Sequence, residues 1–150
     1  VADVLTRLDL SPETGRFEAG AVLTATVIGH DDAYQLTVLD HAGQQIEAPR
    51  TDLAIGAQVR LRVRARDVML ATQRPSGISA RNILRGTIRE IAEEPDTAYA
   101  ETLVDIGGAS LRSRITRKTV AELGLAPGAP VYAIVKAVTF DRKSLAATGP

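Results

Sequence analysis

Residues 53–59 read Leu53-Ala54-Ile55-Gly56-Ala57-Gln58-Val59, and residues 125–131 repeat the pattern as Leu125-Ala126-Pro127-Gly128-Ala129-Pro130-Val131. The first stretch leads into a run in which Val and Leu alternate with Arg, and the second leads into an apolar run; both predict a strand. Two further strand-like runs and a glycine turn precede each stretch, with Gly43 in the first copy and Gly107-Gly108 in the second. The two copies predict an internal duplication of a small five-stranded barrel.

The predicted fold is therefore all-β in the main, with two barrels in tandem. We place the first barrel at residues 18–73 and the second at residues 74–142, between a leading segment at 1–17 and a flexible tail at 143–150. The chain begins in mid-pattern without Met, so we expect it to be the end of a longer protein.

Two short helices are predicted. Val1–Leu10 is amphipathic. Arg117–Leu123 is bounded by Thr116, a suitable N-terminal cap, and by Gly124, a suitable C-terminal residue. The second helix has no counterpart in the first barrel.

Composition limits the function classes. With 45% hydrophobic and 24% charged residues the chain is typical of a soluble globular protein, and it lacks an apolar run long enough to span a membrane. The absence of cysteine excludes a disulfide or thiolate site and suits a cytoplasmic location. Residues 1–71 carry 7 Lys+Arg against 10 Asp+Glu, whereas residues 72–150 carry 11 against 8. This difference favours the second half as the half that binds an anion.

The candidate site is Ser79-Ala80-Arg81-Asn82 together with Lys136-Ala137. All of its polar side chains can donate a hydrogen bond, and no carboxylate occurs between Pro75 and Arg89. Such a site suits a small, fully deprotonated oxyanion such as molybdate, tungstate or sulfate. Phosphate, which keeps a proton near neutral pH, needs an acceptor opposite it. Lys136 follows the apolar run Val131–Val135, and we expect a charge there to be buried and to need an anionic partner.

Other motifs have simpler interpretations. Arg60, Arg62, Arg64 and Arg66 alternate with apolar residues, which is typical of the outer face of a strand. Arg112, Arg114 and the start of the predicted helix form a second basic cluster, for which an anion site and ordinary capping stay open. His30 is interpreted as a turn residue. A Gly-rich nucleotide loop followed by Lys-Ser/Thr is absent, so no ATP hydrolysis by that route is predicted.

The motifs Ser79–Gly86, Arg114–Leu125 and Val135–Ala137 together resemble the molybdate-binding Mop module, an oligonucleotide/oligosaccharide-binding (OB)-like barrel. The resemblance covers about residues 74–142. His30–Leu39 and Arg64–Val68 are similar to the accessory region of the molybdate ABC-transporter ATPase. The whole chain thus resembles the C-terminal regulatory (TOBE/Mop) region of that ATP-binding protein.

The resemblance implies a set of contacts to molybdate or tungstate. They come from the side chains or backbone amides of Ser79, Ala80, Arg81, Asn82, Thr116, Thr119, Lys136 and Ala137. In the family such groups converge across a subunit interface, which implies a homodimer. It also implies partners in an ATPase domain and membrane permease subunits, a location at the inner face of the membrane, and feedback inhibition of uptake. No metal and no cofactor are expected. Val138 departs from members with a hydroxyl residue there, and Arg66-Asp67 is taken as the first-half equivalent of Lys136-Ala137, without a site of its own.

Two alternatives stay open. One is a free-standing tandem-barrel protein that stores molybdate. The other is an OB-type nucleic-acid-binding module, against which the five aromatic residues and zero net charge argue. The choice among molybdate, tungstate and sulfate and the dimerisation of the isolated chain are not decided by the sequence.

Overall fold

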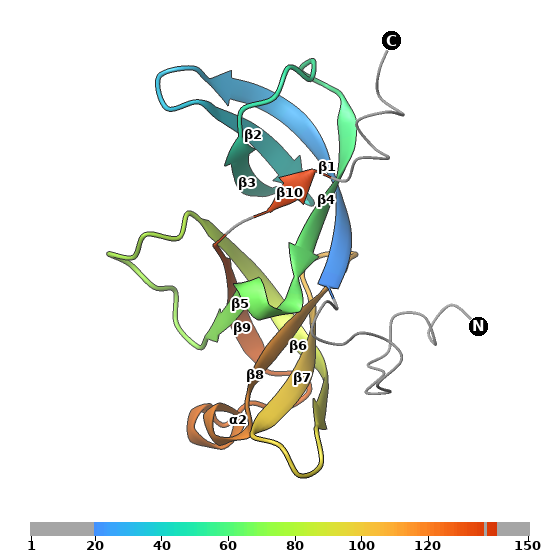
Figure 1. Cartoon of the computed structure of the whole chain (residues 1–150), viewed down its shortest axis with the longest axis vertical. Coiled ribbons are helices and arrows are strands. Elements are labelled where there is room, and N and C mark those ends of the chain that lie inside the picture. The colour runs from blue at the N-terminus through green and yellow to red at the C-terminus, as the bar shows by residue number, and fades with distance from the viewer. Residues whose placement is uncertain (1–19, 137, 141–150) are drawn as a thin grey trace, which may run out of the picture.

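The computed structural model of the chain describes residues 20–136 and 138–140, and its strands form two curled, five-stranded antiparallel sheets (Figure 1). The predicted fold class is confirmed. The predicted helix Val1–Leu10 and the tail 143–150 lie outside the described residues. The first sheet has the order β10 (Thr139–Phe140), β4 (Gln58–Arg64), β1 (Gly20–Asp31), β2 (Leu36–His41) and β3 (Gln44–Pro49). The second has the order β5 (Val68–Ala71), β9 (Pro130–Val135), β6 (Asn82–Glu93), β7 (Tyr99–Asp105) and β8 (Ser110–Thr116).

The repeated glycine stretch makes the same contacts in both sheets. Gly56 N–H donates to the carbonyl of Val27 at 2.7 Å, and Gly128 N–H donates to the carbonyl of Ile88 at 2.7 Å. Both glycines have positive φ, 95° and 92°, which favours glycine there. The long strands β1 and β6 also bulge directly after Val27 and Ile88. The predicted duplication is therefore confirmed in the hydrogen bonds of the backbone.

Each half completes the sheet of the other. β5, which follows the first half and the short 3₁₀ helix η2 (Ala65–Asp67), pairs with β9, so that Val68 lies opposite Val135. β10 returns to the first sheet, where Phe140 lies opposite Leu61. The sheets thus divide the chain differently from the ranges 18–73 and 74–142, which stay a prediction about domains.

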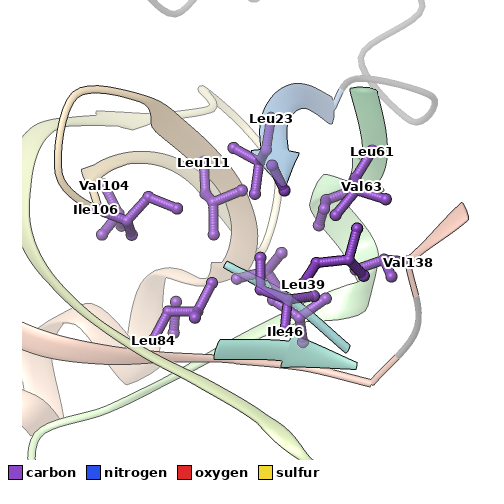
Figure 2. Packing of buried hydrophobic residues seen from close by; sticks show 14 of the residues in the cluster. Leu23, Leu39, Ile46, Leu61, Val63, Leu84, Val104, Ile106, Leu111 and Val138 are labelled. Carbon is purple, nitrogen blue, oxygen red and sulfur yellow. The ribbon is translucent and has the colours of Figure 1, made fainter. Parts of the chain in front are cut away.

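One apolar core spans both sheets (Figure 2). Leu23, Leu39 and Leu61 enter it from the first sheet, and Leu84 and Leu111 from the second, all at most 1% exposed. Burial of each such side chain contributes about 1.5–3 kcal/mol. On β4 the alternate residues are exposed, so Arg60, Arg62 and Arg64 lie on the outer face as predicted, whereas Arg66 is exposed in η2. No helix among the described residues is long and apolar enough to span a membrane.

The helix α2 (Arg117–Leu123) has the predicted bounds and caps. Thr119 N–H donates to Thr116 Oγ1 at 3.1 Å, and Gly124 adopts the left-handed conformation with φ of 65°. These local signals act within one turn of the chain, which is why the sequence alone predicts them.

Candidate functional site

Several residues of the predicted site lie where β6 begins and β9 ends. Asn82 lies opposite Val135, so Arg81 and Lys136 lie next to each other at one edge of the second sheet. A hollow of about 200 Å³ is bordered by three of the predicted site residues, Arg81, Asn82 and Lys136. The remaining walls are Leu36, Glu47, Ala48, Pro49 and Val138. The structure therefore brings two cationic side chains together against the edge of the first half.

Asn82 fixes the position of this edge. Its side chain is 4% exposed, and both ends of the amide bind the backbone of Glu47 on β3. Glu47 N–H donates to Asn82 Oδ1 at 2.8 Å, and Asn82 Nδ2 donates to the Glu47 carbonyl at 3.1 Å. Asn82 thus joins β6 to β3, and we call this contact between β3 and β6 the first seam.

Arg81 forms a two-point ion pair across the first seam. Its Nε and Nη2 donate to the two carboxylate oxygens of Glu47 at 2.8 and 3.1 Å. The Arg81 side chain is 73% exposed and that of Glu47 only 13%. The hydrogen bonds from Arg81 lower the pKa of Glu47, and the same bonds raise the pKa of Arg81. Glu47 adds a carboxylate that the sequence did not predict. It lies 34 residues before Arg81, and no local pattern connects the two.

Lys136 corrects one prediction. It lies just beyond the end of β9 and is exposed, so the expectation of a buried charge is wrong. The apolar run ends at Val135, and the backbone N–H of Lys136 donates to the carbonyl of Asp67 at 3.4 Å. Ser79 is exposed and Ala80 half-buried in the connection between β5 and β6. Ala137 lies outside the described residues. Val138, in contrast, is buried in the core at 5% exposure.

Thr116 and Thr119 lie away from Arg81 in the same chain. Thr116 pairs with Tyr99 at the start of β7, which lies beside the last residues of β6. Arg81, in contrast, lies immediately before the first residue of β6. The 12 residues of β6 span about 35–40 Å when extended. Figure 1 accordingly places α2 at the bottom of the molecule and β10 in its upper half. A single chain does not bring these two threonines to Arg81 and Lys136.

Arg114 of the second basic cluster is engaged in a buried network. Arg114 donates to both carboxylate oxygens of Glu94 at 2.9 and 3.0 Å and lies 3.8 Å from Glu101. Its guanidinium also stacks on Tyr99, 4.0 Å from the ring centre. The hydrogen bonds to Glu94 raise the pKa of Arg114. We therefore assign Arg114 to stability of the second barrel.

The register of the two halves corrects one equivalence. Gly56 and Gly128 occupy equivalent positions in the two halves, so Arg64-Ala65 is the equivalent of Lys136-Ala137. The prediction that Arg66-Asp67 is that equivalent is wrong. By the same register Ala21 corresponds to Asn82. The first half therefore keeps a cation at the Lys136 position and lacks the amide.

The described residues contain no group of three or more His, Asp or Glu side chains that could hold a metal ion. Besides the Glu47 carboxylate, the hollow is bordered by the two cations Arg81 and Lys136 and the amide of Asn82, and two adjacent cations suit binding of an anion.

Comparison with known proteins gives a consistent result. Residues 78–139 match the family model of the TOBE domain. The chain is 46% identical to the molybdenum import ATP-binding protein ModC of Mesorhizobium japonicum, over 98% of this chain and 40% of that protein. It is 40% identical to ModC 1 of Azotobacter vinelandii, over 92% of this chain and 38% of that protein. The chain thus spans about two fifths of the length of these relatives.

A solved structure has the same fold. It is the cytoplasmic molybdate-binding protein ModG with molybdate bound, with a TM-score of 0.66 and 32% sequence identity. The match covers 80% of this chain and 95% of that one, so the resemblance extends over both barrels.

Proposed function

The chain belongs to the same family as the molybdate-binding protein ModG and contains a region that matches the TOBE domain, and we propose that it binds molybdate or tungstate at the first seam. One observation carries this proposal. Arg81, Asn82 and Lys136, which match the family motifs, meet in one hollow although more than fifty residues separate the two motifs. Two adjacent cations suit a dianion.

The chemistry follows from the donors. The Arg81 fork and the Lys136 ammonium bind the oxyanion, and the Ser79 hydroxyl and the amides of Ala80 and Ala137 complete its shell. Hydrogen bonds between charged groups contribute about 1.5–3 kcal/mol each. The oxyanion replaces Glu47 as the partner of Arg81, so binding exchanges one carboxylate for one dianion.

A second copy of the chain supplies Thr116 and Thr119. Their separation from Arg81 along β6 supports a site shared between two copies. The two hydroxyls share one hydrogen bond of 2.8 Å, which leaves one hydroxyl proton of the pair to donate to an anion. Oxyanion binding thereby stabilises a homodimer.

The regulatory role rests on the relatives. In a longer ATP-binding protein, oxyanion binding joins the tails of two subunits and lowers transport, with the ATPase domain and the permease subunits as partners at the cytoplasmic side. The chain itself has no catalytic role. The equilibrium shifts because the joined arrangement binds the anion more tightly than the separate one.

A free-standing molybdate-binding protein is the second candidate, and the 95% coverage of ModG favours it. The mass of the native assembly with and without molybdate separates the two. A dimer that forms with molybdate supports the regulatory tail, whereas a larger closed assembly at all molybdate concentrations supports storage.

The test is calorimetric titration of the chain with molybdate, tungstate and sulfate. Arg81→Ala should weaken molybdate binding by about tenfold or more. The matched control is Arg62→Ala on the outer face of β4, which removes the same charge and should bind as the parent chain does. Equal binding by all three proteins, or no binding of any oxyanion, would contradict the proposal.

A further inference from the structure

The contact between β8 and β1 is the counterpart of the first seam, and we call it the second seam. The strand registers place Arg112 at the position of Glu47 and Ala109 at the position of Gln44. In the first seam Gln44 bridges to β6, where it accepts from Arg85 N–H at 2.7 Å and donates to the Arg85 carbonyl at 3.0 Å. Alanine cannot form this bridge, and Ala21 likewise lacks the amide of Asn82.

The missing side chains leave a hollow of about 530 Å³ in the second seam. It is lined by Ala21, Val22, Thr24, His41, Arg89, Leu103, Gly108, Ala109, Ser110 and Arg112. No Asp or Glu occurs among these described lining residues, whereas two arginines do. Arg89 Nη1 donates to Ser110 Oγ at 3.3 Å, so a guanidinium and a hydroxyl already lie together in the wall. The hollow is therefore suited to an anion.

His41 borders the hollow and carries a buried hydrogen-bond acceptor. The residue is 8% exposed, and its Nδ1 lies 2.8 Å from the carbonyl oxygen of Thr24. A carbonyl only accepts, so Nδ1 carries the hydrogen, and Nε2 of the neutral ring is an acceptor. Within the part of the chain that the structure describes, this buried Nε2 has no hydrogen-bond partner. A buried polar atom without a partner is unfavourable, and a ligand that donates to it removes this penalty.

We propose that the hollow of the second seam binds inorganic phosphate in its monohydrogen form. The Arg89 guanidinium and the Ser110 hydroxyl bind the charged oxygens, and the phosphate hydroxyl donates to His41 Nε2. Sulfate has the same shape and charge but no proton at neutral pH, so it leaves Nε2 unpaired. This acceptor separates the second seam from the donor set of Ser79, Arg81 and Lys136, and the proposal stands whether or not that set binds molybdate.

The test is calorimetric titration of the 150-residue chain with inorganic phosphate and with sulfate at mildly alkaline pH, where inorganic phosphate is mainly in its monohydrogen form. Two variants address the hollow by different means. Arg89→Gln removes a cation from the wall, and Ala109→Gln inserts the side chain that bridges the first seam. The matched control is Arg62→Gln on the outer face of β4, which removes the same charge as Arg89→Gln.

Phosphate should bind at least about tenfold more tightly than sulfate, and either hollow variant should weaken it by about tenfold or more. The control should bind phosphate as the parent chain does. Circular dichroism should show all four proteins folded, and a hollow variant that is unfolded is set aside in favour of the other. Sulfate binding as tight as phosphate binding, unchanged phosphate binding in both folded hollow variants, or no phosphate binding at millimolar concentration would overturn the proposal.

Discussion

The two seams have the same backbone and opposite side-chain chemistry. In the first seam Glu47 and Asn82 bind across β3 and β6, and the hollow beside Arg81 and Lys136 measures about 200 Å³. In the second seam their counterparts are Arg112 and Ala21, and the contact is hollow. The backbone ladder and the glycine turn recur because they form the barrel. The exposed and seam-facing residues differ because they do not form the barrel. The two halves therefore share a fold and differ in the side chains of their seams.

The barrels also differ in how they are stabilised. Arg114 in β8 occupies the place that Pro49 holds in β3. Only the second barrel thus has the network of Arg114 with Glu94 and Glu101, whose two carboxylate side chains are at most 3% exposed. The following predictions test how far this difference extends.

The largest effect is expected from Arg114→Met. The change removes the cation that pairs with Glu94 and lies beside Glu101, and breaking a buried pair costs about 3–5 kcal/mol. Urea unfolding measures the loss. The control Arg117→Met removes an ion pair with Glu93 in which both side chains are about half exposed, and it should change stability by less than about 1 kcal/mol. Equal losses in both variants would show that the network is not a special feature of the second barrel.

Gly86→Ala should destabilise the chain by about 2–3 kcal/mol. A Cβ at this position would lie 2.8 Å from the carbonyl oxygen of Asp105 and 2.7 Å from Val104 Cγ1. The first barrel has Ala25 at the equivalent place, so the close approach is particular to the second. Gly29→Ala is the control, because among the described residues nothing lies within 4 Å of its added Cβ. A stability of Gly86→Ala close to that of Gly29→Ala would disprove the close packing.

Glu47→Gln should have a small effect on stability and a larger one on binding. Removing the carboxylate that competes for Arg81 should tighten molybdate binding several-fold, as titration would measure. The pKa of Glu47 is lowered in the folded chain, so its ionised form stabilises the fold above the unfolded pKa of about 4.3. That contribution is lost as pH falls through the lower folded pKa.

The control for the role of Glu47 is therefore the pH dependence of the free energy of unfolding. The stability difference between the parent chain and Glu47→Gln should be present at neutral pH and shrink in acid. A difference that stays constant from neutral pH to acid, or molybdate binding that weakens in the variant, would contradict the role given to Glu47.

Local signals explain what the sequence predicts well. Thr116 and Gly124 act on neighbouring residues, so the helix follows from the local pattern. The duplication follows from the repeat of residues 53–59 at 125–131, although Gly56 and Gly128 bond to the distant carbonyls of Val27 and Ile88. Which sheet receives β5 and β10 depends on pairing across the molecule, and strands of four and two residues carry little pattern of their own. Glu47 was missed for the same reason, since its contact with Arg81 spans 34 residues. Lys136 was misjudged because the strand ends one residue earlier.

Lys136 and Arg64 hold equivalent places in the two halves, and they test the central claim most directly. Calorimetric titration with molybdate should show that Lys136→Ala weakens binding by about tenfold or more, while Arg64→Ala leaves it unchanged. This result would place the oxyanion at the first seam. Equal weakening in both variants, or full binding in Lys136→Ala, would contradict it.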